Sequence, residues 1–143
     1  MNTAVKTDNI SKTYPGVLAN SNVSITINAS SIHAVVGENG AGKSTLMKIL
    51  YGMIKPDSGN IEIFNNSASI SSPKEAINLG IGMVHQHFML AKNLTVLENI
   101  ILGIDRASLK NLGLSKYKKQ IQDVMKTYSL DIDLNMFVDE LSV

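Results

Sequence analysis

The sequence contains no cysteine, which excludes both disulfide bonds and thiolate metal sites. No apolar run approaches the roughly 20 residues that a membrane-spanning helix needs, and the polar residues 1–10 are unlike a signal peptide. The net charge is only +1, so no broad electrostatic field would recruit nucleic acid or anionic lipid. We therefore expect a soluble, cytoplasmic protein that does not bind nucleic acid.

The chain of 143 residues is long enough to form the core of one domain. Its 44% of hydrophobic and 17% of charged residues are ordinary for a globular protein and argue against disorder. The composition therefore indicates a folded domain and leaves its function open.

One segment carries a specific chemical pattern, the Walker A motif G-x-x-x-x-G-K-[ST]. Its glycines let consecutive backbone N–H groups point inward at an anion. Lys43 can reach the β- and γ-phosphates of a nucleotide, and the Ser44 hydroxyl can bind Mg²⁺. The pattern consists of Gly37, Glu38, Asn39, Gly40, Ala41, Gly42, Lys43, Ser44 and Thr45.

The residues on either side of the pattern suit a phosphate-binding loop. Ile32–Val36 is an apolar run of the buried-strand type. Leu46–Leu50 has helical spacing, and Gly52 is placed to end that helix, whose positive dipole end would face the same anion. The alternative is a glycine-rich turn that binds nothing. We predict that the chain binds a nucleoside triphosphate or descends from a protein that did.

The rest of the first ninety residues mixes strands and turns. Alternating patterns predict strands at residues 5–10, 23–27 and 61–64, and residues 81–85 read as a second buried strand. Tyr14-Pro15-Gly16 and Pro56-Asp57-Ser58-Gly59 are typical of turns.

Helix-start signals occur twice more along the chain. Ser72 and Glu75 predict a capping box with Pro73 in the first helical position, for a helix that ends near Gly80. Thr95-Val96-Leu97-Glu98 predicts a second capping box and a short helix through Leu102. Residues 115–129 also have helical spacing. The segment from about residue 95 onwards is therefore expected to be mostly helical.

Several separated features together resemble the ATP-binding subunits of ABC transporters. Tyr14 precedes the loop where this family keeps an aromatic residue, and Gln86 follows a buried strand as the family's Q-loop glutamine does. Residues 56–61 look like the hairpin after the first helix. Leu141-Ser142-Val143 resembles the opening of the signature Leu-Ser-Gly-Gly-Gln, with valine in the third place. Within the family, residues 81–90 resemble the import ATPases for nucleosides and simple sugars.

The resemblance implies an α/β fold, a P-loop NTPase of ABC type that is truncated. An antiparallel β subdomain and part of the parallel core sheet would form a nucleotide-binding core over residues 1–92. A partial helical subdomain would follow over residues 93–143. The strands that flank Ile32–Val36 would come from later in a full cassette, which would leave this segment at an uncovered apolar edge.

The resemblance also implies residue roles and cofactors, namely ATP and Mg²⁺. Tyr14 would stack on adenine, and the alternative is that it fills a turn. Gln86 would place its amide oxygen on Mg²⁺ and orient the attacking water. Spacing alone fits a surface polar residue as well, and the resemblance favours the Mg²⁺ role. His85 and His87 lie on either side of Gln86. They do not indicate a metal site, because no third ligand is near them in the sequence.

One segment imitates a Walker B strand. Leu134–Val138 is followed by Asp139 and Glu140, a pair that would hold Mg²⁺ and activate water. Asn135 breaks the apolar run that a central strand requires, and in the family Walker B follows the signature. We therefore predict that Asp139 and Glu140 are surface residues ahead of the signature helix.

On this alignment the chain ends inside the signature and lacks Walker B, the D-loop and the switch histidine. We expect weak nucleotide binding and negligible turnover. The resemblance implies a parent ATPase on the inner face of the cell membrane, where it energises import. Its partners would be transmembrane permease subunits, a second ATP-binding domain in a dimer or fused tandem, and indirectly an extracytoplasmic solute-binding protein.

Other functions have weaker support in the sequence. A non-transport ABC ATPase acting on ribosomes or damaged DNA would need basic patches or zinc motifs. A GTPase would need an Asn-Lys-x-Asp motif, and a kinase would need an arginine-rich lid, whereas the chain has a single arginine, Arg106. An inactive nucleotide-binding fragment remains an alternative for the chain as it stands.

Overall fold

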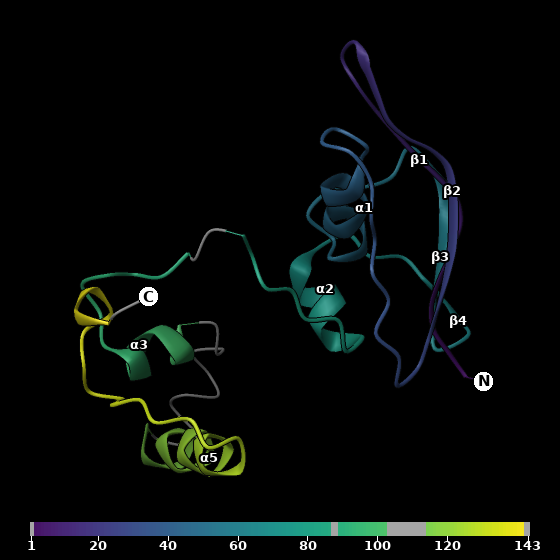
Figure 1. Ribbon diagram of the computed structural model, residues 1–143. Coiled ribbons are helices and arrows are strands. Elements are labelled where there is room, and N and C mark those ends of the chain that lie inside the picture. The colour runs from purple at the N-terminus through teal and green to yellow at the C-terminus, as the bar shows by residue number, and fades with distance from the viewer. Residues whose placement is uncertain (1, 87–88, 103–113, 142–143) are drawn as a thin grey trace. The chain divides into compact units, whose positions relative to one another are not determined.

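A computed structural model describes residues 2–86, 89–102 and 114–141. The chain divides into two compact units, Met1–Val84 and His85–Val143. The first unit runs from purple to teal in Figure 1 and contains all the strands of the described residues. The second unit, green to yellow, is helical.

The first unit is built on a four-stranded antiparallel sheet in the order β2-β1-β3-β4. The strands are β1 (Thr3–Tyr14), β2 (Val17–Asn28), β3 (Ser58–Ile63) and β4 (Asn66–Ala68). The three strands predicted from alternation are confirmed, and β1 and β2 are longer than predicted. β4 has only three residues and was not predicted.

Two tight turns set the register of this sheet. Pro15 and Gly16 join β1 to β2 with Tyr14 opposite Val17, and the φ of 77° at Gly16 is one that glycine adopts without cost. Phe64 and Asn65 join β3 to β4 with φ of 49° and 62°, the signature of a type I′ hairpin. Phe64 therefore lies in a turn and not in the predicted strand.

The turn predicted over Pro56–Gly59 is only partly formed. Ser58 pairs with Ser11, so that β3 already begins at Ser58 and takes in Gly59. Next to this pair, the Asp57 N–H donates a hydrogen bond to the Ser11 carbonyl over 2.9 Å. Long-range strand pairing has overridden the local turn preference at the second half of the segment.

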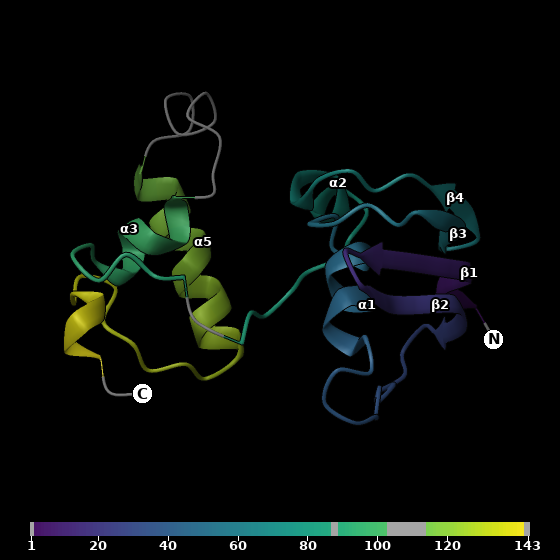
Figure 2. The ribbon, with the colours of Figure 1, turned by 90° about the horizontal axis from the view of Figure 1, so that it is seen from above.

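Two helices cover one side of the sheet, as Figures 1 and 2 show. They are α1 (Lys43–Leu50) and α2 (Pro73–Asn78). Gly52, with φ of 75°, follows α1 as predicted, and α2 ends before Gly80. The core between helices and sheet consists of Ile10, Leu46, Ile49, Leu50, Ile61, Ile63, Ile70 and Ala76.

The capping of α2 differs in one respect from the prediction. The Ser72 hydroxyl accepts a hydrogen bond from the Glu75 N–H, as expected of an N-cap. The Glu75 carboxylate, however, accepts from the N–H and hydroxyl of Ser71, one residue earlier than a capping box requires. These bonds hold the pKa of Glu75 below its ordinary value of 4.5.

The two predicted strands of the parallel core sheet are wrong. Residues 32–36 and 81–85 have no strand structure, and the side chains of Ile32 (102% exposed) and Val84 (88%) lie in solvent. A strand is stable only when its backbone groups are paired by a neighbour. Among the described residues, no segment pairs with either run.

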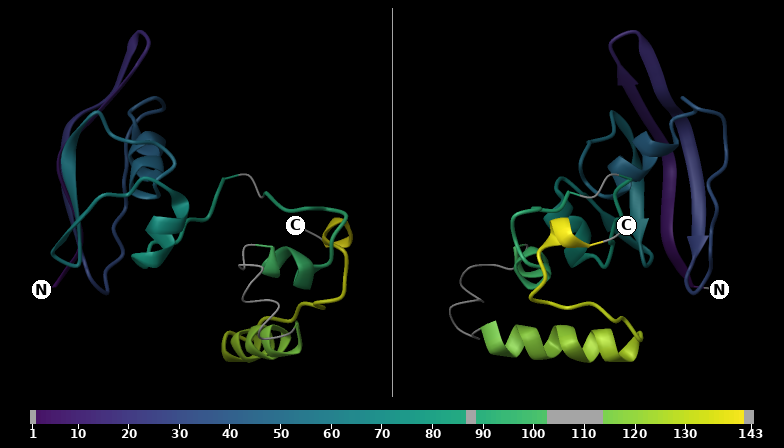
Figure 3. Two further views of the ribbon diagram at one scale, coloured as in Figure 1. Left: turned by 180° about the vertical axis from the view of Figure 1, so that it is seen from behind. Right: turned by 60° about the vertical axis from the view of Figure 1, so that its left-hand side comes forward.

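The second unit consists of α3 (Val96–Ile101), α5 (Leu114–Thr127) and a 3₁₀ turn at Val138–Glu140. After α5 the chain runs back to α3 (Figure 3), where the Leu97 N–H donates to the Leu134 carbonyl over 2.9 Å. None of the helices among the described residues has the length and apolar character to cross a bilayer.

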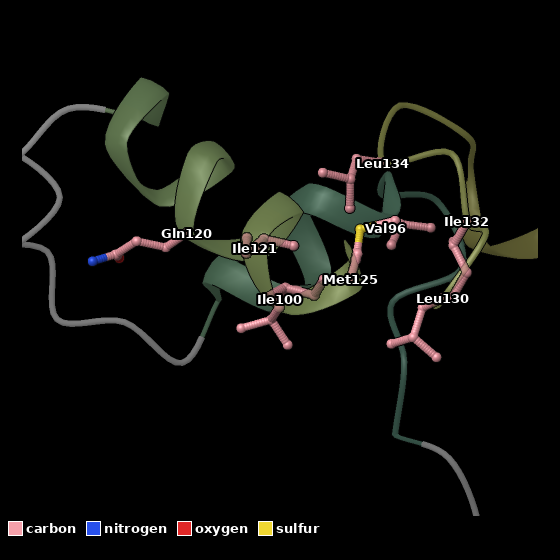
Figure 4. A pocket seen from close by; sticks show the side chains of 9 residues that line it. Val96, Ile100, Gln120, Ile121, Met125, Leu130, Ile132 and Leu134 are labelled. Carbon is pink, nitrogen blue, oxygen red and sulfur yellow. The ribbon is translucent and has the colours of Figure 1, made fainter. Parts of the chain in front are cut away.

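Apolar side chains of this unit face one another around a cavity of about 350 Å³ (Figure 4). Val96 and Ile100 come from α3, and Ile121 and Met125 from α5. Leu134, which is buried, closes one side together with the segment that follows α5. Residues 134–138 thus pack against α3 as a turn and an isolated bridge, and they do not form a strand.

The capping box predicted for α3 is confirmed. The Thr95 hydroxyl accepts from the Glu98 N–H, and the Glu98 carboxylate accepts from the N–H and hydroxyl of Thr95 at 2.8 and 2.9 Å. The two bonds from Thr95 hold the pKa of the Glu98 carboxyl below its ordinary value of 4.5.

We predict that Thr95→Ala raises the pKa of Glu98 toward 4.5, as measured by a carboxyl carbon NMR titration. Because the folded-state pKa is lowered, ionised Glu98 stabilises α3 above pH 4.5, and this stabilisation is lost as the pH falls through the lower folded value. Glu75, whose pKa is lowered by Ser71, should titrate unchanged in the variant. An unmoved Glu98 titration would contradict the capping geometry.

Candidate functional site

The predicted phosphate-binding loop leads directly into α1. Gly40 and Gly42 adopt φ of 87° and 83°, in the left-handed region that favours glycine. The Ala41 N–H donates to the Glu38 carbonyl over 3.2 Å and so closes a turn within the loop. Gly42 is the N-cap of α1, and no side chain among the described residues caps this end. The backbone N–H groups of the first helical turn are thus available to an anion.

Lys43 connects the two ends of the loop. Its ammonium donates hydrogen bonds to the carbonyl oxygens of Gly37 and Glu38, each over 2.7 Å. Both acceptors are neutral, whereas a phosphate offers charged oxygens that make stronger hydrogen bonds with an ammonium. Lys43 is therefore held at the loop and can exchange these carbonyls for phosphate oxygens.

A pocket of about 340 Å³ brings Tyr14 and the loop together. Tyr14, Val17 and Ala19 line one part from the β1–β2 hairpin, and residues 39–45 line the other. Tyr14 is 36% exposed, which leaves ring surface for a ligand. Of the predicted nucleotide-binding residues, Gly37 and Glu38 do not line the pocket but hold Lys43 through their carbonyls. The pocket thus combines backbone amides, an ammonium and a hydroxyl with an aromatic ring, and these groups fit Mg-ATP.

Strand β2 supplies two contacts that sequence analysis missed. Gly42 lies so close to β2 that a Cβ atom there would come within 2.0 Å of the Ala19 carbonyl oxygen. Asn20 is only 5% exposed, and its Nδ2 donates to the Gly42 carbonyl over 3.3 Å. The Asn20 Oδ1 is buried without a hydrogen-bond partner among the described residues. Nothing in the sequence pairs residue 20 with residue 42, so no local signal could have found this contact.

A second group of residues lies near the tip of the β1–β2 hairpin that carries Tyr14. The Asp57 carboxylate accepts hydrogen bonds from the Lys12 ammonium over 2.6 Å and from the Thr13 N–H over 2.7 Å. The Lys12 Nζ lies over the ring of Tyr14, 5.9 Å from its centroid. The hydrogen bond from Lys12, and then that from Thr13, hold the pKa of Asp57 below its ordinary value of 3.8.

The predicted Mg²⁺ ligands come from different units. Ser44 lines the pocket of the first unit, and Gln86 is an exposed residue of the second. Their joint binding of Mg²⁺ stays a prediction. The described residues contain no cluster of histidine and carboxylate side chains that could hold a metal ion. His87, Ser142 and Val143 lie outside the described residues.

Asp139 and Glu140 are exposed, as predicted, and belong to the 3₁₀ turn of the second unit. No aspartate or glutamate is among the described residues that line the pocket at the loop. The described residues that line this pocket therefore carry groups suited to binding phosphate, and no carboxylate is among them.

Sequence comparisons give a consistent set of relatives. The profile of the family described as ABC transporter matches residues 20–143. The chain is 43% identical, over 94% of its length, to the guanosine import ATP-binding protein NupO of Bacillus subtilis. It is 42% identical, over 99%, to the nucleoside import protein NupA of Lactococcus lactis. With the ribose import protein RbsA of Hahella chejuensis, it shares 40% over 100%. It spans only 26%, 28% and 29% of these relatives.

Solved structures agree on the fold. A nucleotide-free ATP-binding cassette from an ABC transporter matches with a TM-score of 0.78 at 27% identity, over 98% of this chain and 59% of the other. A cassette in a dimeric post-hydrolysis state, bound to ADP and Pi, matches with a TM-score of 0.74 at 28% identity, over 96% and 63%. The expected α/β fold of a P-loop ATP-binding cassette is thus confirmed.

We predict that Gly42→Ala destabilises the first unit far more than Gly40→Ala. Both glycines have left-handed φ, which costs alanine about 1 kcal/mol, but a Cβ at Gly40 meets nothing within 4 Å. At Gly42 the clash with β2 adds about 1–3 kcal/mol, as for an overpacked core site. Thermal unfolding followed by circular dichroism measures both, and equal melting temperatures would refute the close approach.

Proposed function

Since the chain belongs to the ABC transporter family, we propose that it binds Mg-ATP at its loop as part of an ATP-binding subunit that energises nucleoside or simple-sugar import. The single observation that carries the proposal is the shared pocket of Tyr14 and residues 39–45, with Lys43 held at its edge. A base-stacking ring and a phosphate cradle at one pocket are what a nucleotide requires.

Each residue of the pocket has a distinct role in this proposal. The N–H groups of residues 42–45 and the dipole of α1 bind the phosphates. Lys43 leaves the carbonyls of Gly37 and Glu38 and donates to the β- and γ-phosphates. The Ser44 hydroxyl and the Gln86 amide oxygen would hold Mg²⁺, and the bound ion would neutralise phosphate charge. Tyr14 stacks on the adenine.

Hydrolysis needs a group that accepts a proton from water. Among the described residues no carboxylate lines the pocket, and Asp139 and Glu140 are exposed in the second unit. Without a positioned base, no group would take the proton from the attacking water. We infer that the chain of 143 residues binds nucleotide without turning it over, and that a longer subunit would hydrolyse ATP.

The partners follow from the relatives and from the exposed surface. The named relatives are import ATP-binding proteins, and one similar cassette is described as dimeric. We propose that the subunit docks on transmembrane permease subunits at the inner face of the membrane. It would pair with a second ATP-binding domain and receive its solute through an extracytoplasmic binding protein. Met89 and Leu90 are exposed apolar side chains that suit the permease surface.

Calorimetry with Mg-ATP on the folded 143-residue chain tests the binding. We predict measurable affinity that Lys43→Ala reduces about tenfold or more, because charge-assisted hydrogen bonds to phosphate are lost. Lys48→Ala is the matched control, since Lys48 is an exposed lysine at the far end of the same helix. If the folded chain binds no Mg-ATP, or if the two variants behave alike, the proposed function is wrong.

A phosphate-release assay tests the inferred lack of turnover. We predict that the 143-residue chain releases phosphate from ATP no faster than its Lys43→Ala variant, since no carboxylate is among the described residues that line the pocket. Turnover that exceeds the variant's would show that the base lies elsewhere in this chain.

A further inference from the structure

We propose that Asp57 and Lys12 are positioning residues for nucleobase binding, which hold the ring of Tyr14 at its place in the pocket. The proposal rests on the proposed function, because it presumes that Tyr14 stacks on a nucleobase. Asp57 lies between α1 and β3, far from Tyr14 in sequence, and the structure brings it to the end of β1.

The hairpin that carries Tyr14 extends past the rest of the sheet (Figure 1). The last pair between β1 and β3 joins Ser11 to Ser58, whereas β1 continues to Tyr14 in its pairing with β2. On the β3 side, no strand of the described residues reaches the N–H of Thr13. That side of the hairpin needs another hydrogen-bond partner to stay in place.

Asp57 is this partner, and it makes three contacts with three consecutive residues of β1. Its N–H donates to the Ser11 carbonyl over 2.9 Å, and its carboxylate accepts from the Thr13 N–H over 2.7 Å and from Lys12 Nζ over 2.6 Å. A single residue from the α1–β3 loop thus takes over where strand pairing stops, and it fixes β1 just before Tyr14.

Lys12 links Asp57 to the ring of Tyr14. Lys12 and Tyr14 are two residues apart in β1, so their side chains lie on the same face of the sheet. The side chain of Lys12 is only 17% exposed, and its Nζ lies over the ring 5.9 Å from the centroid, within cation–π range. Asp57 holds the ammonium over the ring, and the ring itself lines the pocket.

The effect of this arrangement should be confined to the base of the nucleotide. Lys43 and the loop amides contact phosphates, which Mg-ATP and Mg-tripolyphosphate share, whereas Tyr14 meets only a base. Asp57→Asn and Lys12→Met are therefore expected to weaken Mg-ATP binding about threefold to tenfold and to leave Mg-tripolyphosphate binding unchanged. Lys12→Arg keeps a cation over the ring and should restore Mg-ATP binding.

Calorimetry with both ligands on the folded 143-residue chain is the experiment. Glu62→Gln is the matched control. It breaks the pair of Glu62 with Lys6, which is another lysine of β1 and lies away from Tyr14. It should leave both affinities unchanged. A double-mutant cycle completes the test: in a Tyr14→Ala background, Asp57→Asn should cost no further Mg-ATP affinity.

The outcomes separate the inference from the proposed function. If Mg-ATP binds and depends on Lys43, but Asp57→Asn either has no effect or weakens both ligands equally, the positioning role is overturned and the function stands. An effect of Asp57→Asn that persists in the Tyr14→Ala background also overturns it. If the folded chain binds neither ligand, both proposals are wrong. Should Asp57→Asn not fold, Lys12→Met and Lys12→Arg decide by the same comparison.

Discussion

The close approach of Gly42 to strand β2 is the contact on which the phosphate-binding loop depends. A side chain at residue 42 would collide with the Ala19 carbonyl, so only glycine lets α1 start at this place. Asn20 fills the remaining space and donates to the Gly42 carbonyl, the same oxygen that accepts the first hydrogen bond of α1 from the Leu46 N–H. The start of the helix, and with it the direction of its N–H groups, is thus set by a strand more than twenty residues earlier.

The antiparallel sheet organises both halves of the nucleotide pocket. One end of β2 supports the loop through Ala19 and Asn20, and the hairpin of β1 and β2 carries Tyr14. The support of the loop and the ring of Tyr14 thus both come from the β1–β2 hairpin. Asp57, which follows α1 in the chain, binds the tip of this hairpin. The proposed base and phosphate sites are therefore connected through the same hairpin.

The helix caps and the apolar runs show how far local signals determine structure in this chain. The capping box of Thr95 and Glu98 is confirmed bond by bond, because all its partners lie within four residues. The same reasoning placed the carboxylate of Glu75 one residue away from its observed partner, Ser71. The apolar runs at residues 32–36 and 81–85 were wrongly predicted as strands. Hydrophobicity shows that a segment seeks burial, and only a paired neighbour makes it a strand.

The sequence by itself determined the loop pattern, the helix starts, the turn at Pro15 and Gly16 and the family resemblance, since each depends on residues that are close along the chain. Only the tertiary structure decided that Gly42 touches Ala19, that Asn20 supports the loop, and that Asp57 reaches the strand of Tyr14. These contacts join residues separated by 22 to 44 positions. Their partners are selected by the packing of α1 on the sheet, and no local periodicity records that choice.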